Sequence, residues 1–212
     1  MSLSAKEHLR ALLVEKSVCH GEFSLASGAK SDLYVDARVT TLDPRGAYLI
    51  GEVGWQLVKE TSAKLGRPVN AIGGLTLGAD PVALSIGMAA QRERASVDGD
   101  GRQLQAALSP LQVFTVRKAA KEHGRQRRIE GNFAKGDSVV VVDDVITTGG
   151  STIQAIEAIE EAGGRVAFVL VLVDREEGGR ENIGKRGYQV FPIFTRADLV
   201  EANPKRSHPA IA

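Results

Sequence analysis

The sequence has little that would point to a disulfide-stabilised or nucleic-acid-binding protein. Cys19 is the only cysteine among 212 residues, which excludes an intrachain disulfide and a cysteine-based metal cluster. Charges nearly balance, with 27 Lys and Arg against 26 Asp and Glu, and aromatic residues make up only 5%. Since nucleic-acid surfaces usually combine a basic excess with interleaved aromatics, we expect no nucleic-acid partner.

Long apolar runs are also missing. No run approaches the roughly 20 residues that span a bilayer, and the opening residues, MSLSAKEHLR, lack the apolar segment of a signal peptide. We therefore expect a cytoplasmic protein without a membrane partner. An apolar fraction of 43% is ample for a hydrophobic core, and the length suits a single domain over residues 1–212.

What the sequence does have is a regular alternation of strand-like and helical segments. Strands are expected at 69–75, 111–116, 138–143, 165–174 and 188–194. Helices are expected at 4–16, 44–65, 79–92, 152–163 and 195–202. Short antiparallel strands are expected on either side of Ser27-Gly28. Near-continuous apolar strands alternating with helices are typical of a parallel sheet covered on both faces, so the predicted fold is α/β with one central sheet.

Two segments lack any apolar period. Residues 94–110 are rich in Gly and Asp and predict a surface insertion, while the polar, basic residues 117–131 predict a mobile loop.

The stretch VVVVDDVITTGGSTIQAI, residues 139–156, has the composition of a binding site. Two acids, Asp143 and Asp144, follow a buried strand, and residues 147–151 form a polar turn before a helix. Ligands of parallel sheets bind beyond the carboxyl ends of the strands, where helix N-termini favour anions. A phosphate suits the turn, and hydroxyls or a metal suit the acids, so phosphoribose fits both. The alternative interpretation is that the acids only cap a turn.

This stretch resembles the phosphoribosyl-pyrophosphate motif of the type I phosphoribosyltransferases. Residues 116–131, VRKAAKEHGRQRRIEG, resemble the catalytic loop of the orotate phosphoribosyltransferase family. Residues 21–38, GEFSLASGAKSDLYVDAR, resemble that family's N-terminal hood, and residues 172–179, LVDREEGG, its post-strand Asp-Arg. The resemblance covers most of the chain and implies the type I phosphoribosyltransferase fold, with a hood over about 1–40 and a core over about 41–205.

The resemblance implies a reaction and its participants. The enzyme would transfer 5-phosphoribose from phosphoribosyl pyrophosphate to orotate with Mg²⁺, giving orotidine 5′-phosphate and pyrophosphate, in UMP biosynthesis. A homodimer with shared active sites is implied as well. Mg²⁺ is expected to be held mainly by substrate and water, near the two acids.

The resemblance also implies which residues act. The implied catalytic residues are Lys121, His123 and Asp144. The implied donor-binding residues are Arg117, Lys118, Lys121, His123, Asp143, Asp144, Val145, Ile146, Thr147, Thr148, Gly149, Gly150 and Ser151. The implied orotate-binding residues are Thr147 and Arg175. Cations in the loop suit a reaction that gathers a pyrophosphate and a carboxylate in one pocket.

Other interpretations stay open at this point. The basic segment, extended by Arg125, Arg127 and Arg128, also suits a solvated charge run or a nucleic-acid contact. Within the fold, the alternatives are a purine or uracil phosphoribosyltransferase and a non-catalytic regulator, although intact Lys121 and His123 argue against a regulator.

Two positions depart from the family pattern. Ala26 and Leu77 stand where some members have lysines that help bind the pyrophosphate, and Lys30 is a candidate substitute for the charge at 26.

Overall fold

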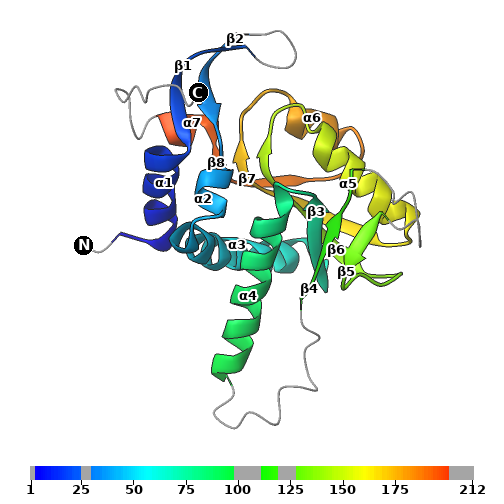
Figure 1. Ribbon diagram of the computed structural model, residues 1–212. Helices are drawn as coiled ribbons and strands as arrows, with labels where there is room; N and C mark the ends of the chain where they lie inside the picture. The colour runs from blue at the N-terminus through cyan, green and yellow to red at the C-terminus, as the bar shows by residue number, and fades with distance from the viewer. Residues whose placement is uncertain (1–2, 25–29, 98–110, 119–127, 201–212) are drawn as a thin grey trace.

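The computed structural model describes residues 3–24, 30–97, 111–118 and 128–200. Its centre is a six-stranded sheet of order β5-β4-β3-β6-β7-β8, with a two-stranded sheet above it (Figure 1). The six strands are β3 (Ala71–Leu75), β4 (Gln112–Val116), β5 (Ile129–Gly131), β6 (Ser138–Ile146), β7 (Arg165–Asp174) and β8 (Val190–Thr195). All neighbours are parallel except β4 and β5. The predicted α/β fold with a mostly parallel central sheet is confirmed.

Helices cover both faces of this sheet. They are α1 (Ala5–Lys16), α2 (Arg38–Thr41), α3 (Pro44–Leu65), α4 (Ala79–Val97), α5 (Gly150–Glu161), α6 (Gly179–Gly184) and α7 (Arg196–Val200). Because side chains alternate along a strand, β6 divides its valines between two cores. Val140 and Val142 pack in the cluster that includes α3 and α4, whereas Val139 and Val141 pack with α5. Burial on both faces explains the continuous run of valines. Each described helix is too short or too polar to cross a bilayer.

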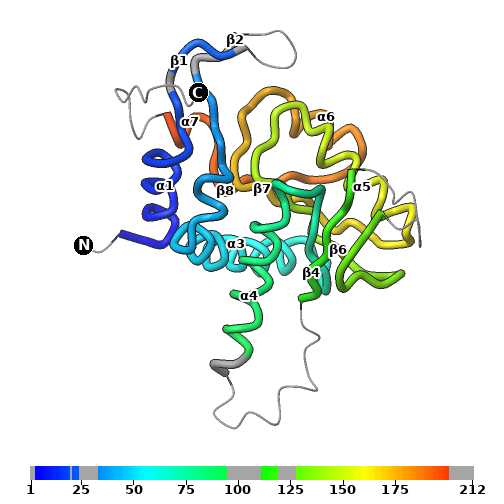
Figure 2. The backbone as a smooth tube through the Cα atoms, in the orientation of Figure 1, coloured from blue at the N-terminus to red at the C-terminus, as the bar shows by residue number. Residues whose placement is uncertain are grey.

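The hood is the antiparallel pair β1 (Val18–Ser24) and β2 (Lys30–Val35). Leu33 and Val35 of β2 are buried in the same cluster as Leu9 and Leu13 of α1 and the α3–α4 side of the sheet. The hood is therefore packed into the main core, and it stands over the carboxyl ends of the sheet strands (Figure 2).

Several expected boundaries were wrong. Strand β6 continues to Ile146, past both acids, because Val145 and Ile146 pair with Val173 and Asp174 of β7. The expected loop over 117–131 ends in a strand, since β5 pairs with β4. The expected insertion begins as helix, because α4 runs to Val97 without a helix breaker. The short helices α2 and α6 were not expected, and residues 98–110 and 119–127 lie outside the described residues.

Candidate functional site

Asp143 and Asp144 point to opposite faces of β6. Asp143 shares the face of Val139 and Val141, so its side chain lies against α5 and is buried. There the Thr152 hydroxyl donates to Asp143 Oδ2 at 2.8 Å, and the Asp144 N–H donates to Asp143 Oδ1 at 3.1 Å. Both oxygens of Asp143 are thus used within the protein, which makes it a brace between β6 and the first turn of α5.

Asp144 faces the other way and is partly exposed. Its Oδ1 accepts the Val145 N–H at 2.8 Å. The loop after β3 closes over it so tightly that a Cβ on Gly78 would lie 2.3 Å from Asp144 Oδ1. Among the described residues, no donor hydrogen bonds to Asp144 Oδ2, so this oxygen is available to a ligand.

Both carboxyl groups hold protons more strongly than usual. Burial, and then repulsion from Asp144, raises the pKa of Asp143 to about 7. Burial also raises the pKa of Asp144, opposed by the Val145 N–H group and by the charge of Arg38. Near neutral pH the pair therefore carries less than its full two negative charges, which lowers its repulsion of an anionic ligand.

The turn after β6 leaves the N-terminus of α5 open. Its N-cap is Gly149, in a left-handed conformation with φ of 82°, and it offers no side-chain cap. By contrast, Ser4 caps α1 and Asp43 caps α3. The first N–H groups of a helix have no acceptor inside it. The hydroxyls of Thr147, Thr148 and Ser151 also make no hydrogen bond to the described part of the protein. These hydroxyls and the first N–H groups of α5 are therefore available to an anion.

The segment 178–182 supports this turn from behind. Gly149 and Gly179 approach so closely that a Cβ on Gly179 would lie 2.6 Å from the Thr147 carbonyl oxygen. The Asn182 side chain donates to the Thr148 carbonyl at 3.1 Å. The sequence analysis missed this support; its signal was the Gly178-Gly179 pair after β7, which permits the close contact.

Asp80 at the start of α4 joins two other loops of the site. It accepts hydrogen bonds from Thr76 at 2.7 Å and from Thr115 at 2.5 Å. Thr76 directly follows β3, and Thr115 is the last but one residue of β4. Thr76 belongs to the loop over Asp144, and β4 leads into Arg117. The side chain of Leu77, at the tip of that loop, is 73% exposed. Asp80 was also missed, since its partners come from separate strands.

The predicted cationic loop is only partly described. Arg117 pairs with Glu130 at 2.9 Å, and its N–H donates to the Arg128 carbonyl, which continues the β4–β5 ladder. Lys118 is exposed. Lys121 and His123 lie outside the described residues, so their roles stay predictions.

Arg175 is buried where β7 meets the hood. Its Nη2 donates to the Leu33 carbonyl at 2.8 Å and pairs with Glu177 at 2.7 Å. Its backbone N–H donates to the Ile146 carbonyl at 3.0 Å. This geometry makes Arg175 an anchor of the hood over the end of β6, and its orotate-binding role stays a prediction.

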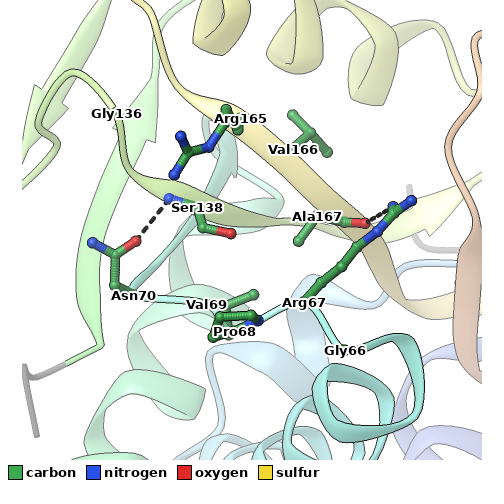
Figure 3. A pocket seen from close by; sticks show the side chains of 10 residues that line it. All are labelled: Gly66, Arg67, Pro68, Val69, Asn70, Gly136, Ser138, Arg165, Val166 and Ala167. Carbon is green, nitrogen blue, oxygen red and sulfur yellow. Dashed lines mark hydrogen bonds between the residues drawn. The ribbon is translucent and has the colours of Figure 1, made fainter.

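A separate hollow lies at the opposite, amino edge of the sheet (Figure 3). Two of its polar side chains are bonded within the protein: Asn70 Oδ1 accepts the Ser138 N–H at 2.7 Å, and Arg67 donates to the Ala167 carbonyl at 2.9 Å. The geometry favours the carboxyl edge as the functional site, because there the donors are open.

The oxygen ligands at the carboxyl edge suit a hard cation that the protein coordinates only weakly. No three His, Cys, Asp or Glu side chains converge among the described residues. One open carboxylate, Asp144, fits Mg²⁺, which usually keeps several waters and takes its other ligands from substrate oxygens.

Comparison with known proteins points to one family. The phosphoribosyl transferase domain family matches residues 102–195. An orotate phosphoribosyltransferase from Aquifex aeolicus is 39% identical, over 94% of this chain and 100% of the relative. One from Streptomyces coelicolor is 46% identical, over 80% and 82%. A crystal structure of the Mycobacterium tuberculosis orotate phosphoribosyltransferase with 5-phospho-alpha-D-ribosyl 1-diphosphate superposes with a TM-score of 0.68 at 33% identity, covering 92% of this chain and 99% of that one.

Proposed function

The chain belongs to the orotate phosphoribosyltransferase family, and from this premise we propose that it transfers 5-phosphoribose from phosphoribosyl pyrophosphate to orotate, forming orotidine 5′-phosphate and pyrophosphate. The observation that carries the proposal is the pairing of an open helix N-terminus at Gly149 with the free carboxylate oxygen of Asp144. The first suits the 5′-phosphate and the second suits the ribose hydroxyls of the same molecule.

The residues of the chain divide the work by charge. Donors of the turn 147–151 would hold the 5′-phosphate, and Asp144 would accept a hydrogen bond from a ribose hydroxyl. When bound, Mg²⁺ would neutralise the leaving pyrophosphate. Lys118, with Lys121 and His123, would place positive charge where the leaving group gains negative charge, which is the main way a protein lowers the barrier of such a step. Orotate N1 can enter as an anion, and in that case the reaction needs no general base.

The acceptor is the point that most needs a direct test. We expect turnover of phosphoribosyl pyrophosphate with orotate and Mg²⁺, and little with adenine, hypoxanthine or uracil, measured as pyrophosphate release. Preference for another base would replace the proposal with a purine or uracil enzyme. No turnover with any base, despite donor binding, would favour the regulator.

A bound ligand tests the placement of the phosphate. A crystal structure with ribose 5-phosphate should show its phosphate on the N–H groups of residues 149–151. A phosphate located at the amino-edge hollow instead would contradict the proposal, because that edge would then hold the anion site.

We also propose that the protein works as a homodimer in the cytoplasm. Support for the dimer comes from an apolar stripe on α4 and the loop before it, which we define as Leu77, Leu84 and Met88. Leu84 and Met88, four residues apart on one side of α4, are 54% and 64% exposed, and Leu77, in the loop just before the helix, is 73% exposed. A stripe that begins beside Asp144 suits a second copy that approaches the site.

Two experiments test the dimer. Met88→Glu should lower the mass measured by light scattering to that of a monomer, whereas Leu3→Glu, at another exposed leucine, should not. Mixing Lys121→Ala with Asp144→Asn subunits should restore activity if the loop acts on the neighbouring site. If verified subunit exchange restores nothing, the loop serves its own subunit.

A further inference from the structure

The segment 178–182, which follows β7, contacts the back of the turn 147–151 at two consecutive carbonyl groups. The Asn182 side chain donates from Nδ2 to the Thr148 carbonyl oxygen at 3.1 Å. Gly179 lies so close to the preceding carbonyl that a Cβ on it would be 2.6 Å from the Thr147 oxygen and 3.3 Å from the Thr147 carbonyl carbon. Both carbonyl oxygens of the turn therefore face this segment.

The direction of each carbonyl fixes the direction of the N–H group that follows it. Both peptide units are trans, and a trans peptide unit is planar, so its C=O and its N–H point to opposite sides. Since Asn182 holds the Thr148 carbonyl from behind, the Gly149 N–H points toward the open side of the turn. In the same way, the Thr147 carbonyl beside Gly179 directs the Thr148 N–H away from the segment. Neither N–H donates a hydrogen bond within the described residues, so both are available to an anion.

The carboxamide of Asn182 is held at both of its polar atoms. Its Oδ1 accepts a hydrogen bond from Lys185 Nζ at 3.3 Å, which leaves Nδ2 to face the Thr148 carbonyl. The neighbouring side chain of Ile183 is buried against the turn, where a Cβ on Gly149 would lie 3.1 Å from it. Asn182 is therefore placed by α6 and by its own hydrogen bonds, and it lies on the side of the turn away from the anion site.

We propose that Asn182 is a positioning residue for the 5′-phosphate, which it serves by holding the Thr148 carbonyl so that the Gly149 N–H points at a phosphate oxygen. The inference rests on the proposed function, which places the 5′-phosphate on this turn. Asn182 acts through the peptide unit and does not touch the ligand. A donor that is already oriented loses less conformational freedom when the ligand binds, so the ligand binds more tightly.

The test compares a ligand that has the 5′-phosphate with one that lacks it. Asn182→Leu keeps the branched shape of the side chain and removes the donor. It should weaken the affinity for ribose 5-phosphate about fivefold in calorimetry, the effect of one lost hydrogen bond, and raise KM for phosphoribosyl pyrophosphate to a similar degree. The affinity for magnesium pyrophosphate and kcat at saturating substrates should change by less than about twofold, because only the binding of the 5′-phosphate is affected.

Two further measurements separate positioning from a general effect on α6. In proton–nitrogen correlation spectra, ribose 5-phosphate should move the Gly149 amide proton resonance downfield in wild type and by less in Asn182→Leu. The matched control is Arg186→Ala. Arg186 follows α6 and pairs with Glu157 of α5 at 2.8 Å, so it links the same segment to the same helix away from the turn. Its removal should leave the affinity for ribose 5-phosphate unchanged.

Two results would overturn the proposal. One is an affinity for ribose 5-phosphate within about twofold of wild type in Asn182→Leu. The other is an equal loss of affinity in Arg186→Ala. If Asn182→Leu does not fold by circular dichroism, Asn182→Ala decides by the same measurements. Failure of the proposed function would look different: the variant would lose affinity for ribose 5-phosphate as expected, while wild-type protein showed no orotate-dependent turnover.

Discussion

The two edges of the central sheet differ in whether their polar groups are hydrogen bonded within the protein. At the amino edge, Asn70 bonds to Asp137 and Ser138, and Arg67 bonds to a carbonyl of β7. At the carboxyl edge, Thr148 and Ser151 keep their hydroxyls unbonded within the described residues, and the α5 N-terminus has no side-chain cap. Both edges are built from the same strands, so the difference lies in the loops.

This difference separates stability from function. A polar group that is bonded within the protein stabilises the fold, because its loss leaves a partner without a hydrogen bond. A polar group left open contributes little to folding and is available for ligand. The hollow at the amino edge is therefore a poor guide to activity. Variants at the amino edge should cost stability, and variants at the carboxyl edge should cost binding or turnover.

Asp144→Asn should give the largest effect. Loss of the negative charge weakens the hydrogen bond to a ribose hydroxyl, and we expect kcat/KM to fall about 100-fold, measured with saturating Mg²⁺. The melting temperature should stay the same or rise, because one of two repelling charges is gone. A fall in melting temperature with unchanged turnover would show that Asp144 caps a turn.

Asp143→Asn should act mainly on stability, in a pH-dependent way. A carboxyl group whose pKa is raised to about 7 costs no stability below its ordinary value near 4. The cost grows as the pH rises from there to 7 and is complete above 7. An amide removes this cost while keeping partners for Thr152 and the Asp144 N–H. In unfolding titrations with chelator and no ligand, the variant should match wild type near pH 4 and exceed it by about 4 kcal/mol at pH 8.

An equal difference at both pH values would contradict the buried, protonated state of Asp143. Turnover should fall less than in Asp144→Asn, because Asp143 reaches a ligand only through the position of α5. This contrast between adjacent acids tests whether one braces the fold while the other contacts the substrate.

The division between the acids shows what the sequence could and could not predict. The valine run, the acids and the glycine turn predicted the strand, the site and the helix in the right order. Because the expected strand ended at Asp143, strand alternation was not applied to Asp144, and the different roles of the two acids were not predicted. Once β6 runs through both, alternation alone sends them to opposite faces. The extension depends on pairing of Val145 and Ile146 with β7, which is not visible locally.

Contacts between distant segments were also beyond the sequence. From the sequence alone, Asp80 is an ordinary acid in the first turn of a helix. Only the fold brings the Thr76 and Thr115 hydroxyls within hydrogen-bonding distance of it. From the sequence alone, Arg175 is a charged residue after a strand, and only the fold brings the Leu33 carbonyl of the hood to it. Both depend on tertiary packing, which no local pattern encodes.

Asn70→Ala should destabilise the amino edge without affecting activity. Its carboxamide donates to Asp137 Oδ1 and accepts the Ser138 N–H, both at 2.7 Å. Truncation should therefore lower the free energy of unfolding by about 2 kcal/mol. The control is Arg165→Ala in the same hollow. That side chain is exposed and should change stability by less than about 0.5 kcal/mol. Loss of turnover at 20 °C in a folded Asn70→Ala variant would contradict the separation of the two edges.

Ser151→Ala should have the smallest effect and sharpens the comparison most. The hydroxyl is exposed in the first turn of α5 and makes no bond to the described residues, so its removal should leave the melting temperature unchanged. One hydrogen bond to a phosphate oxygen is worth about 1 kcal/mol, which corresponds to a roughly fivefold weaker affinity for ribose 5-phosphate in calorimetry. The backbone N–H groups stay in place, so binding should not be abolished. Gln154→Ala, an exposed position three residues along the same helix, serves as the control and should bind like wild type. If Ser151→Ala binds ribose 5-phosphate as tightly as wild type, the hydroxyl does not contact the phosphate, and the backbone of the turn alone forms the anion site.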